Sequence, residues 1–338
     1  MKVMSKHAFY LSNTLSYLLP QFCWHYDAKK HFTKLSPAQQ SYVMKRVEYA
    51  LGSNGEFSLP DGNAEIADLG HAIRYQNCVI GDCNPKKRKT YFFDFYRTLK
   101  YFSKSAKFTC YFGDIRTEST SRAFVKTRPI NPNSRSTLLK LNSVRHFQLP
   151  KDTQSFEDKI PSAVFRGACH TIQRQQFVEQ FFNDEHINAG CTYKKSKHKQ
   201  FQKAPLSIQE QLKFKYVISI EGQDVATNLK WILNSKSACI MPKPTCESWL
   251  LEGQLKAGVH YIEVAPDFSG LADKIDYYNA HSDQVKTIVK SANEYIAPYK
   301  NKDLERLISY LVVARYMSLS GQLKTQPVAL APAASPPF

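Results

Sequence analysis

The segment Lys215–Ser235, KYVISIEGQDVATNLKWILNS, constrains the fold of this chain more than any other segment. Its opening residues are mainly apolar and β-branched, which is typical of a strand covered on both faces. A polar turn with Gly222 follows, and Asp224 can cap a helix over Val225–Ser235. A strand that enters a helix through such a turn can aim free backbone N–H groups at an anion. The pattern alone also fits an ordinary strand and helix of an α/β core that bind nothing.

Strands and helices alternate through the second half of the chain, which predicts a mainly parallel sheet in an α/β fold. Besides the segment above, the expected strands are Ser162–Phe165, Ala238–Met241 and Val259–Val264. The expected helices are Ile172–Phe182, Glu247–Leu255, those from Leu271 to about Pro298, and Asp303–Leu319. Ligands of such sheets bind beyond the carboxyl ends of the strands, which is where Gly167 and Gly222 fall.

The first half of the chain is mixed in its patterning. Ser36–Leu51 is typical of a helix, with its serine as the N-cap and Pro37 in the first position. Lys89–Phe95 and Lys107–Phe112 have the composition of strands, and Ser136–Val144 fits either a strand or a helix. The N-terminal twenty residues predict an amphipathic helix, which can pack on its own domain or touch a membrane surface.

The chain has 338 residues, enough for two domains of ordinary size. Pro150–Pro161 is polar and charged with proline at both ends, and it is the clearest linker. The predicted organisation is an N-terminal domain over residues 1–150, a linker over 151–161, a C-terminal domain over 162–300, a helix over 301–320 and a disordered tail over 321–338.

Charge and cysteine usage narrow the class of protein. The formal net charge is +17, from 46 Lys and Arg against 29 Asp and Glu, and it favours anionic partners such as nucleic acid, an anionic membrane or phosphorylated substrates. A basic solvated surface without one partner fits the same charge.

The eight cysteines form no CxxC pair, which indicates buried free thiols in a reducing cytoplasm and predicts no metal site. The histidines form no HxxxH or HExxH pattern, and no Walker A or GxGxxG sequence supports ATP hydrolysis or nicotinamide chemistry.

A second candidate site follows the expected strand that ends at Phe165. Arg166, Gly167 and Ala168 come directly after it, and Arg174 lies one to two turns into the next helix. Two guanidinium groups beside a glycine turn suit a cluster of phosphate oxygens, which guanidinium binds bidentately. Two surface arginines with no ligand would give the same pattern.

Two carboxylates are candidates for chemistry. Asp114 ends the strand-like KFTCYFG and is placed as a general base, although it can instead cap the next segment or pair with Arg116. Glu247 begins an expected helix, where it can accept hydrogen bonds from sugar hydroxyls or simply favour the helix dipole. Asn228 and Lys230 lie in the first turns of the helix of the opening segment, where a diphosphate would sit.

Taken in order along the chain, these segments resemble the CAP10-like glycosyltransferases, family 90, and most closely its bacterial lipopolysaccharide-core members. The ordered succession is more specific than any single motif and covers roughly Tyr91–Ile296. The motifs are YFFDFYRTLKYF (Tyr91–Phe102), YFGDI (Tyr111–Ile115), VKTRPI (Val125–Ile130), LLKLNSVRHF (Leu138–Phe147), VFRGA (Val164–Ala168), KYVISIEGQDVATNLKWIL (Lys215–Leu233), MPKPTCESWLLEG (Met241–Gly253) and VHYIEV (Val259–Val264).

The resemblance implies a GT-B architecture of two Rossmann-like domains that face each other across a cleft. The N-terminal domain would serve the acceptor and the C-terminal domain would bind the nucleotide sugar. It also implies an inverting, metal-independent transfer from a UDP-sugar, with no cofactor. Asp114 matches the position of the family's catalytic aspartate.

The resemblance assigns diphosphate contacts to the FRG(S/A)…R motif, here Arg166, Gly167, Ala168 and Arg174. Eukaryotic relatives carry a serine where this chain has Ala168, so one hydroxyl contact is missing. The same comparison directs a second turn towards the UDP phosphates, and it contains Gly222, Asp224, Ala226, Thr227 and Asn228. Relatives have an arginine at the position of Asn228, and Lys230 can supply the missing charge.

The leading hypothesis is therefore transfer of a hexose, glucose or galactose, from a UDP-sugar to a lipopolysaccharide or lipooligosaccharide core. The expected partners are the UDP-sugar, the lipid A–core acceptor and the inner-membrane surface, with no nucleic acid. The expected location is cytoplasmic and peripheral, at the inner face of the cytoplasmic membrane. The enzyme alternative transfers a sugar such as xylose or glucose to capsule polysaccharide or protein, and the non-enzyme alternative is a basic nucleic-acid-binding protein.

Overall fold

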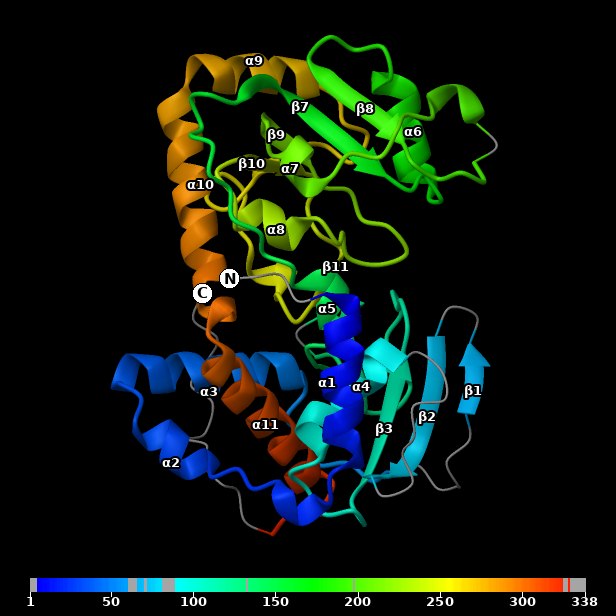
Figure 1. Ribbon diagram of the computed structural model, residues 1–338, viewed down its shortest axis with the longest axis vertical. Helices are drawn as coiled ribbons and strands as arrows, with labels where there is room; N and C mark the ends of the chain where they lie inside the picture. Colours follow the sequence, from blue (N-terminus) through cyan, green and yellow to red (C-terminus); the bar gives the residue numbers. More distant parts are fainter. Residues whose placement is uncertain are drawn as a thin grey trace. The chain divides into compact units, whose positions relative to one another are not determined.

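The computed structural model describes residues 5–59, 66–69, 72–80, 89–131, 133–196, 198–324 and 328 (Figure 1). Its internal contacts divide the chain into two compact units. Of the described residues, unit 1 contains those within 145–245 and 252–298, and unit 2 contains those within 5–144, 246–251 and 299–328. Beyond residue 324, the predicted tail lies outside the described residues apart from residue 328.

Unit 1 is built on a five-stranded sheet whose strands all run parallel, so the prediction of a parallel sheet in an α/β fold is confirmed. Its order is β12-β10-β9-β7-β8. The strands are β7 (Ile160–Gly167), β8 (Ile187–Cys191), β9 (Phe214–Ile218), β10 (Ala238–Met241) and β12 (Ile262–Glu263).

The strand order of unit 1 creates a topological switch point. From β7 the chain moves to β8 on one side, and it then returns to place β9 on the other side of β7. The chain therefore leaves β7 and β9 towards opposite edges of the sheet, and doubly wound sheets bind their ligands at the carboxyl ends of such neighbouring strands. Residues 168–171 form the loop after β7 and residues 219–228 form the loop after β9.

Helices cover the sheet of unit 1 and complete its core. They are α6 (Ile172–Phe181), α7 (Ile208–Gln211), α8 (Leu229–Leu233), α9 (Leu271–Ala280) and α10 (Ser282–Ile296), with 3-10 turns η3 (Lys199–Phe201) and η4 (Glu252–Gln254). Phe177 of α6, Ile275 of α9 and Val285 of α10 are fully buried against the apolar side chains of the strands. This core fixes the strand ends from which the site is built.

Two predictions in this part of the chain are wrong. The helix expected over Val225–Ser235 contains only α8, and Asp224 does not cap it because α8 begins after Asn228, whose side chain makes no cap bond. The helix expected over Glu247–Leu255 is replaced by strand β11 (Cys246–Ser248), a loop and η4. Leu251 has a φ of 60°, a left-handed conformation that ends any right-handed helix there.

Unit 2 contains a mixed five-stranded sheet in the order β1-β2-β3-β4-β6. The first three strands pair antiparallel and the last three pair parallel. Its strands are β1 (Ile66–Leu69), β2 (Ala72–Val79), β3 (Lys107–Phe112), β4 (Ala123–Val125) and β6 (Ser136–Leu138), and β5 (Thr127–Pro129) forms a separate antiparallel ribbon with β11.

The helices of unit 2 pack mainly on one another and also meet the sheet, for example at β6. They are α1 (Lys6–Leu18), α2 (Ala28–Thr33), α3 (Pro37–Leu51), α4 (Lys89–Leu99) and α11 (Lys302–Leu319), with the 3-10 turn η1 (Gln21–Cys23), while α5 (Ser143–His146) and η5 (Ala297–Lys300) span the unit boundaries. Helix α3 begins as predicted, with Pro37 in its first turn and a capping box between Ser36 and Gln39.

The strand predicted over Lys89–Phe95 is wrong, because this segment is the start of α4. Phe93 meets Phe9 of α1 on one side of the helix, whereas Phe95 meets aromatic side chains of β3 and β4 on the other. A helix covered on both sides can be rich in aromatic residues, and such a composition is also typical of a strand.

A buried ionic cluster holds residues 246–251 within unit 2. Glu305 of α11 accepts hydrogen bonds from Arg46, Lys140 and the indole of Trp249 at 2.5–2.7 Å. Burial alone would raise the pKa of Glu305, but the two cations lower it below its usual value. Breaking this cluster would leave a buried charge without a partner.

The free thiols also behave largely as predicted. Of the described cysteines, six are buried and Cys23 is exposed, and none forms a disulfide. Cys83 lies outside the described residues.

Candidate functional site

The side chain of Arg174 lies at the switch point of unit 1. Its guanidinium donates to the carbonyl oxygens of Ile220 and Glu221 after β9 and of Ala168 after β7, at 2.6–3.2 Å. The guanidinium therefore links the loop after β7 to the loop after β9. Burial lowers the pKa of Arg174, but a guanidinium stays charged at neutral pH. Among the described residues, one N–H on each terminal nitrogen has no acceptor, so the group can also bind an anion.

Gly222 makes room for this guanidinium. A Cβ at Gly222 would lie 3.1 Å from Nη2 and 3.2 Å from Cζ of Arg174, closer than most side-chain contacts. The Gly222 N–H donates to the carbonyl of Asp224 at 2.8 Å, which closes a tight turn over the arginine. The glycine of the opening motif thus serves close approach of the turn to Arg174.

Further hydrogen bonds hold the loops at the carboxyl edge of this sheet. Glu221 accepts from the backbone N–H and hydroxyl of Thr245 at 2.9 and 2.5 Å, and so joins the loops after β9 and β10. Asn228 donates to the carbonyl of Ile218 at 2.9 Å and accepts from the hydroxyl of Ser219 at 3.0 Å. The edge is therefore a preorganised set of turns, and Ala226 and Thr227 lie within one of them.

Arg166 is held differently from Arg174. Its guanidinium donates to the carbonyl and side chain of Asn188 in β8 at 2.7–2.8 Å, and to the carbonyls of Phe165 and Ala204. Burial lowers the pKa of this guanidinium below its ordinary value. These bonds direct its side chain along β8, so Arg166 joins the edge mainly by fixing β7 and β8.

Lys230 is completely buried on α8. Its ammonium lies 2.6 Å from Oε1 of Glu252, which is equally buried. An ion pair enclosed in this way holds α8 against η4, and each charge depends on the other.

Breaking this pair is expected to destabilise unit 1. Glu252→Gln leaves a buried ammonium without its counter-charge and should lower the free energy of unfolding by about 3–5 kcal/mol. The control, Lys230→Met with Glu252→Leu, removes both charges and should lie near the wild type in urea denaturation. A double variant that is stable but no longer binds a nucleotide would instead give Lys230 a direct part in ligand binding.

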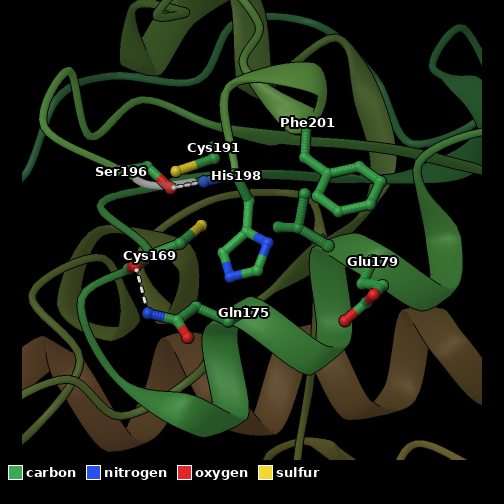
Figure 2. A pocket seen from close by; sticks show the side chains of 8 residues that line it. Cys169, Gln175, Glu179, Cys191, Ser196, His198 and Phe201 are labelled. Carbon is green, nitrogen blue, oxygen red and sulfur yellow. Dashed lines mark hydrogen bonds between the residues drawn. The ribbon is translucent and has the colours of Figure 1, made fainter.

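A small pocket lies beside this edge, between α6 and the chain after β8. Cys169, Gln175, Glu179, Cys191 and His198 line it together with Val178, Ser196 and Phe201, and Figure 2 shows the imidazole pointing inward. Burial raises the pKa of the Cys169 thiol, which disfavours the nucleophilic thiolate. A thiol held protonated in this way is a poor nucleophile at neutral pH.

Asp114 belongs to unit 2, directly beyond the carboxyl end of β3. Lys126 follows the neighbouring parallel strand β4, so its ammonium reaches Oδ1 of Asp114 at 2.5 Å. The hydroxyl of Tyr91 on α4 donates to the same oxygen at 3.3 Å. The lysine is almost completely buried, whereas the aspartate side chain remains 29% exposed. A carboxylate that is oriented from two sides and accessible to solvent can accept a proton from a substrate hydroxyl.

Glu247 also belongs to unit 2 and lies in strand β11. It is 1% exposed, and it accepts from Nε of Arg128 at 2.9 Å and from the hydroxyl of Tyr49 at 2.7 Å. The prediction that Glu247 begins a helix is wrong because this residue pairs with Arg128 across two antiparallel strands.

The structure thus gathers most predicted residues of unit 1 at one sheet edge, namely Arg166, Gly167, Ala168, Arg174, Gly222, Asp224, Ala226, Thr227 and Asn228. Sequence reasoning assigned no role to Lys126, Glu221 or Thr245, although all three occur in or beside the motifs that it used. Within the described ranges, no three His, Cys, Asp or Glu side chains are grouped as a metal site requires. The described helices include none with the length and apolarity to cross a membrane.

Known proteins resemble this chain over the region that contains the candidate site of unit 1. The family model Glycosyl transferase family 90 matches residues 139–320, a range that includes the switch point but not Asp114. The O-glucosyltransferase LpsA of Dichelobacter nodosus is 38% identical over 235 residues, which cover 69% of this chain and 74% of that protein. The uncharacterized protein 035R of Invertebrate iridescent virus 3 is 25% identical over 174 residues, 44% of this chain and 16% of the viral protein. By this family match and the extended similarity to LpsA, the chain belongs to glycosyl transferase family 90.

Proposed function

We propose that this glycosyltransferase moves a hexose from a UDP-sugar to a hydroxyl of a lipopolysaccharide or lipooligosaccharide core. The observation that carries the donor assignment is Arg174, a charged guanidinium at the switch point of a parallel sheet with N–H groups to spare. The name of the relative LpsA, an O-glucosyltransferase, favours glucose as the sugar and a hydroxyl as the acceptor.

The donor diphosphate would bind at the edge of unit 1 between residues 168–171 and 219–228. As the bond from the sugar C1 to the UDP oxygen breaks, negative charge grows on the leaving diphosphate. Arg174 and the backbone N–H groups of residues 225–228 would stabilise that charge without moving, because Glu221 and Asn228 already hold the turn. The proposal includes no metal ion.

Asp114 would act as the base of an inverting transfer. Its carboxylate takes the proton of the acceptor hydroxyl while the acceptor oxygen forms its bond to C1 opposite the departing UDP. Lys126 and Tyr91 orient the carboxylate for this task. The GT-B architecture, with the donor on unit 1 and the acceptor on unit 2, is part of the same proposal.

The remaining candidates would act through the groups that they hold. Arg166 fixes the strand that leads into Gly167, Lys230 fixes α8 through Glu252, and Glu247 fixes β5 through Arg128. In this proposal they are positioning residues, and direct contacts with phosphate or ribose are assigned first to Arg174 and the Gly222–Asn228 turn.

The net charge of +17 favours an acceptor that carries phosphate groups, and an anionic membrane as its setting. A lipid A–core acceptor at the inner face of the cytoplasmic membrane meets both conditions. We therefore propose peripheral attachment at that face.

A donor screen tests the proposal. The purified chain is incubated with a truncated lipooligosaccharide and one of several UDP-sugars, and the products are weighed by mass spectrometry. The expected result is addition of one hexose, with UDP released and with activity unchanged by EDTA. Transfer only to capsule polysaccharide or protein would replace the acceptor assignment, and a strict need for Mn²⁺ would contradict the metal-independent mechanism.

A further inference from the structure

Helix α1 is apolar on two opposite faces. Figure 1 shows α1 beside α4. On the face of α1 towards α4, Phe9 is fully buried and meets Phe93, and Tyr17 meets Phe92 and Tyr96. The inward face also carries Asn13, which accepts a hydrogen bond from Arg97 at 2.7 Å. This face accounts for the attachment of α1 to its own unit.

The opposite face consists of leucines that contact little of the protein. Leu11, Leu15 and Leu18 follow one another at intervals of four and three residues, so they form one stripe along the helix. They are 66%, 58% and 71% exposed, and the stripe continues along the chain through Leu19, 47% exposed, and Phe22, 87% exposed. We call Leu11, Leu15, Leu18, Leu19 and Phe22 the leucine face. A row of large exposed apolar side chains marks an interaction surface more often than a free one.

The segment of the chain that contains the leucine face carries almost only positive charges. In the described residues 5–35, Lys6, Lys29, Lys30 and Lys34 are exposed. Asp27 is the sole acidic residue of that stretch, and its carboxylate caps α2 by accepting from the backbone N–H of Lys30 at 2.9 Å. An apolar face within a lysine-rich segment fits the surface of an anionic bilayer, where anionic headgroups cover an apolar interior.

Positively charged side chains also lie near the C-terminal end of α1. The ammonium of Lys100 donates to Ser16 at 3.0 Å and lies 3.3 Å from the ring centre of Trp24. Burial, together with the nearby charges of Arg306 and Arg97, lowers the pKa of Lys100 to about 8. Lys100, Arg97 and Arg306 therefore add positive charge to the part of unit 2 on which α1 packs.

We propose that the leucine face docks on the surface of an anionic phospholipid bilayer, with α1 lying in the plane of the interface. The leucines and Phe22 would enter the boundary between headgroups and acyl chains, and lysines of the same segment would attract the phosphates. A second copy of this chain fits less well, because two such faces would bring like charges together. The inference rests on the proposed lipid-borne acceptor, to which docking would bring the enzyme.

Vesicle flotation with the purified full chain tests the docking surface. The wild type is expected to float with vesicles that contain phosphatidylglycerol and not with pure phosphatidylcholine, and added salt should weaken binding. The variant Leu11→Ser, Leu15→Ser, Leu18→Ser should bind at least about tenfold more weakly, since it loses three inserted apolar side chains. The matched control, Ile172→Ser with Val259→Ser, alters two exposed apolar residues of unit 1 and should bind as the wild type does.

Each other outcome overturns the inference. If the wild type ignores anionic vesicles, or if the triple serine variant binds them equally well, the leucine face does not dock on lipid. If that variant changes only the oligomeric state in light scattering, the face joins two copies of the chain. Transfer to a water-soluble core oligosaccharide separates this inference from the proposed function. The triple serine variant should keep this transfer activity. If neither the wild type nor the variant transfers a sugar, the proposed function is wrong, but the vesicle-binding result still stands.

Discussion

Replacing Asp114 with asparagine is expected to lower kcat by about 10²–10⁴-fold and to leave UDP binding unchanged, because the amide cannot accept the proton of the acceptor hydroxyl. The substitution preserves the size of the side chain, and its partners Lys126 and Tyr91 belong to the same unit. Steady-state kinetics with the donor and acceptor from the screen, together with calorimetry of UDP binding, would measure both quantities.

Asp303→Asn is the control for this prediction. Asp303 is an exposed carboxylate of unit 2 in the first turn of α11, and its substitution should leave kcat unchanged. Turnover of Asp114→Asn at the wild-type rate would remove Asp114 as the base. A loss of UDP affinity equal to the loss of rate would indicate that the aspartate supports the donor site instead.

Arg174→Lys is expected to raise the Kd for UDP by about 10–100-fold. The lysine keeps the positive charge. It lacks the planar guanidinium, which can bind both loops and offer N–H groups to phosphate oxygens at the same time. The loss of one or two hydrogen bonds to a charged group corresponds to about 1.5–3 kcal/mol. Calorimetric titration with UDP gives the affinity, and the urea midpoint of each variant shows how much of the change comes from weakened loops.

Arg166→Ala provides the comparison. It should also weaken UDP binding, but by a smaller factor, because most N–H groups of Arg166 already donate to Asn188, Phe165 and Ala204. An unchanged Kd for Arg166→Ala would remove this residue from the donor site. An unchanged Kd for Arg174→Lys would contradict the assignment of the switch point itself.

The parallel sheet of unit 1 could be predicted from the sequence because each strand is an apolar run bounded by turn residues. The errors arose where partners distant in sequence decide the structure. Helix α4 is covered by α1 on one side and by the sheet on the other, so it carries a cluster of aromatic residues whose composition is typical of a strand. The composition around Glu247 predicts the start of a helix, but its pairing with Arg128, which is 119 residues away, places it in a strand.

The candidate site was predictable to a similar extent. Arg174 and Gly222 belong to short motifs, and the parallel alternation alone directs both to one edge of the sheet. Lys126 was not predicted, since its approach to Asp114 depends on the parallel pairing of β3 with β4. The burial of Lys230 against Glu252 was equally hidden, because a lysine at the start of a helix is usually exposed.

Hydrogen–deuterium exchange of the full chain with and without UDP is the most direct test of the donor site. Bound diphosphate should slow the exchange of backbone N–H groups in residues 168–171 and 219–228, on both sides of the switch point. Slower exchange confined to other segments, with these two loops unchanged, would contradict the account.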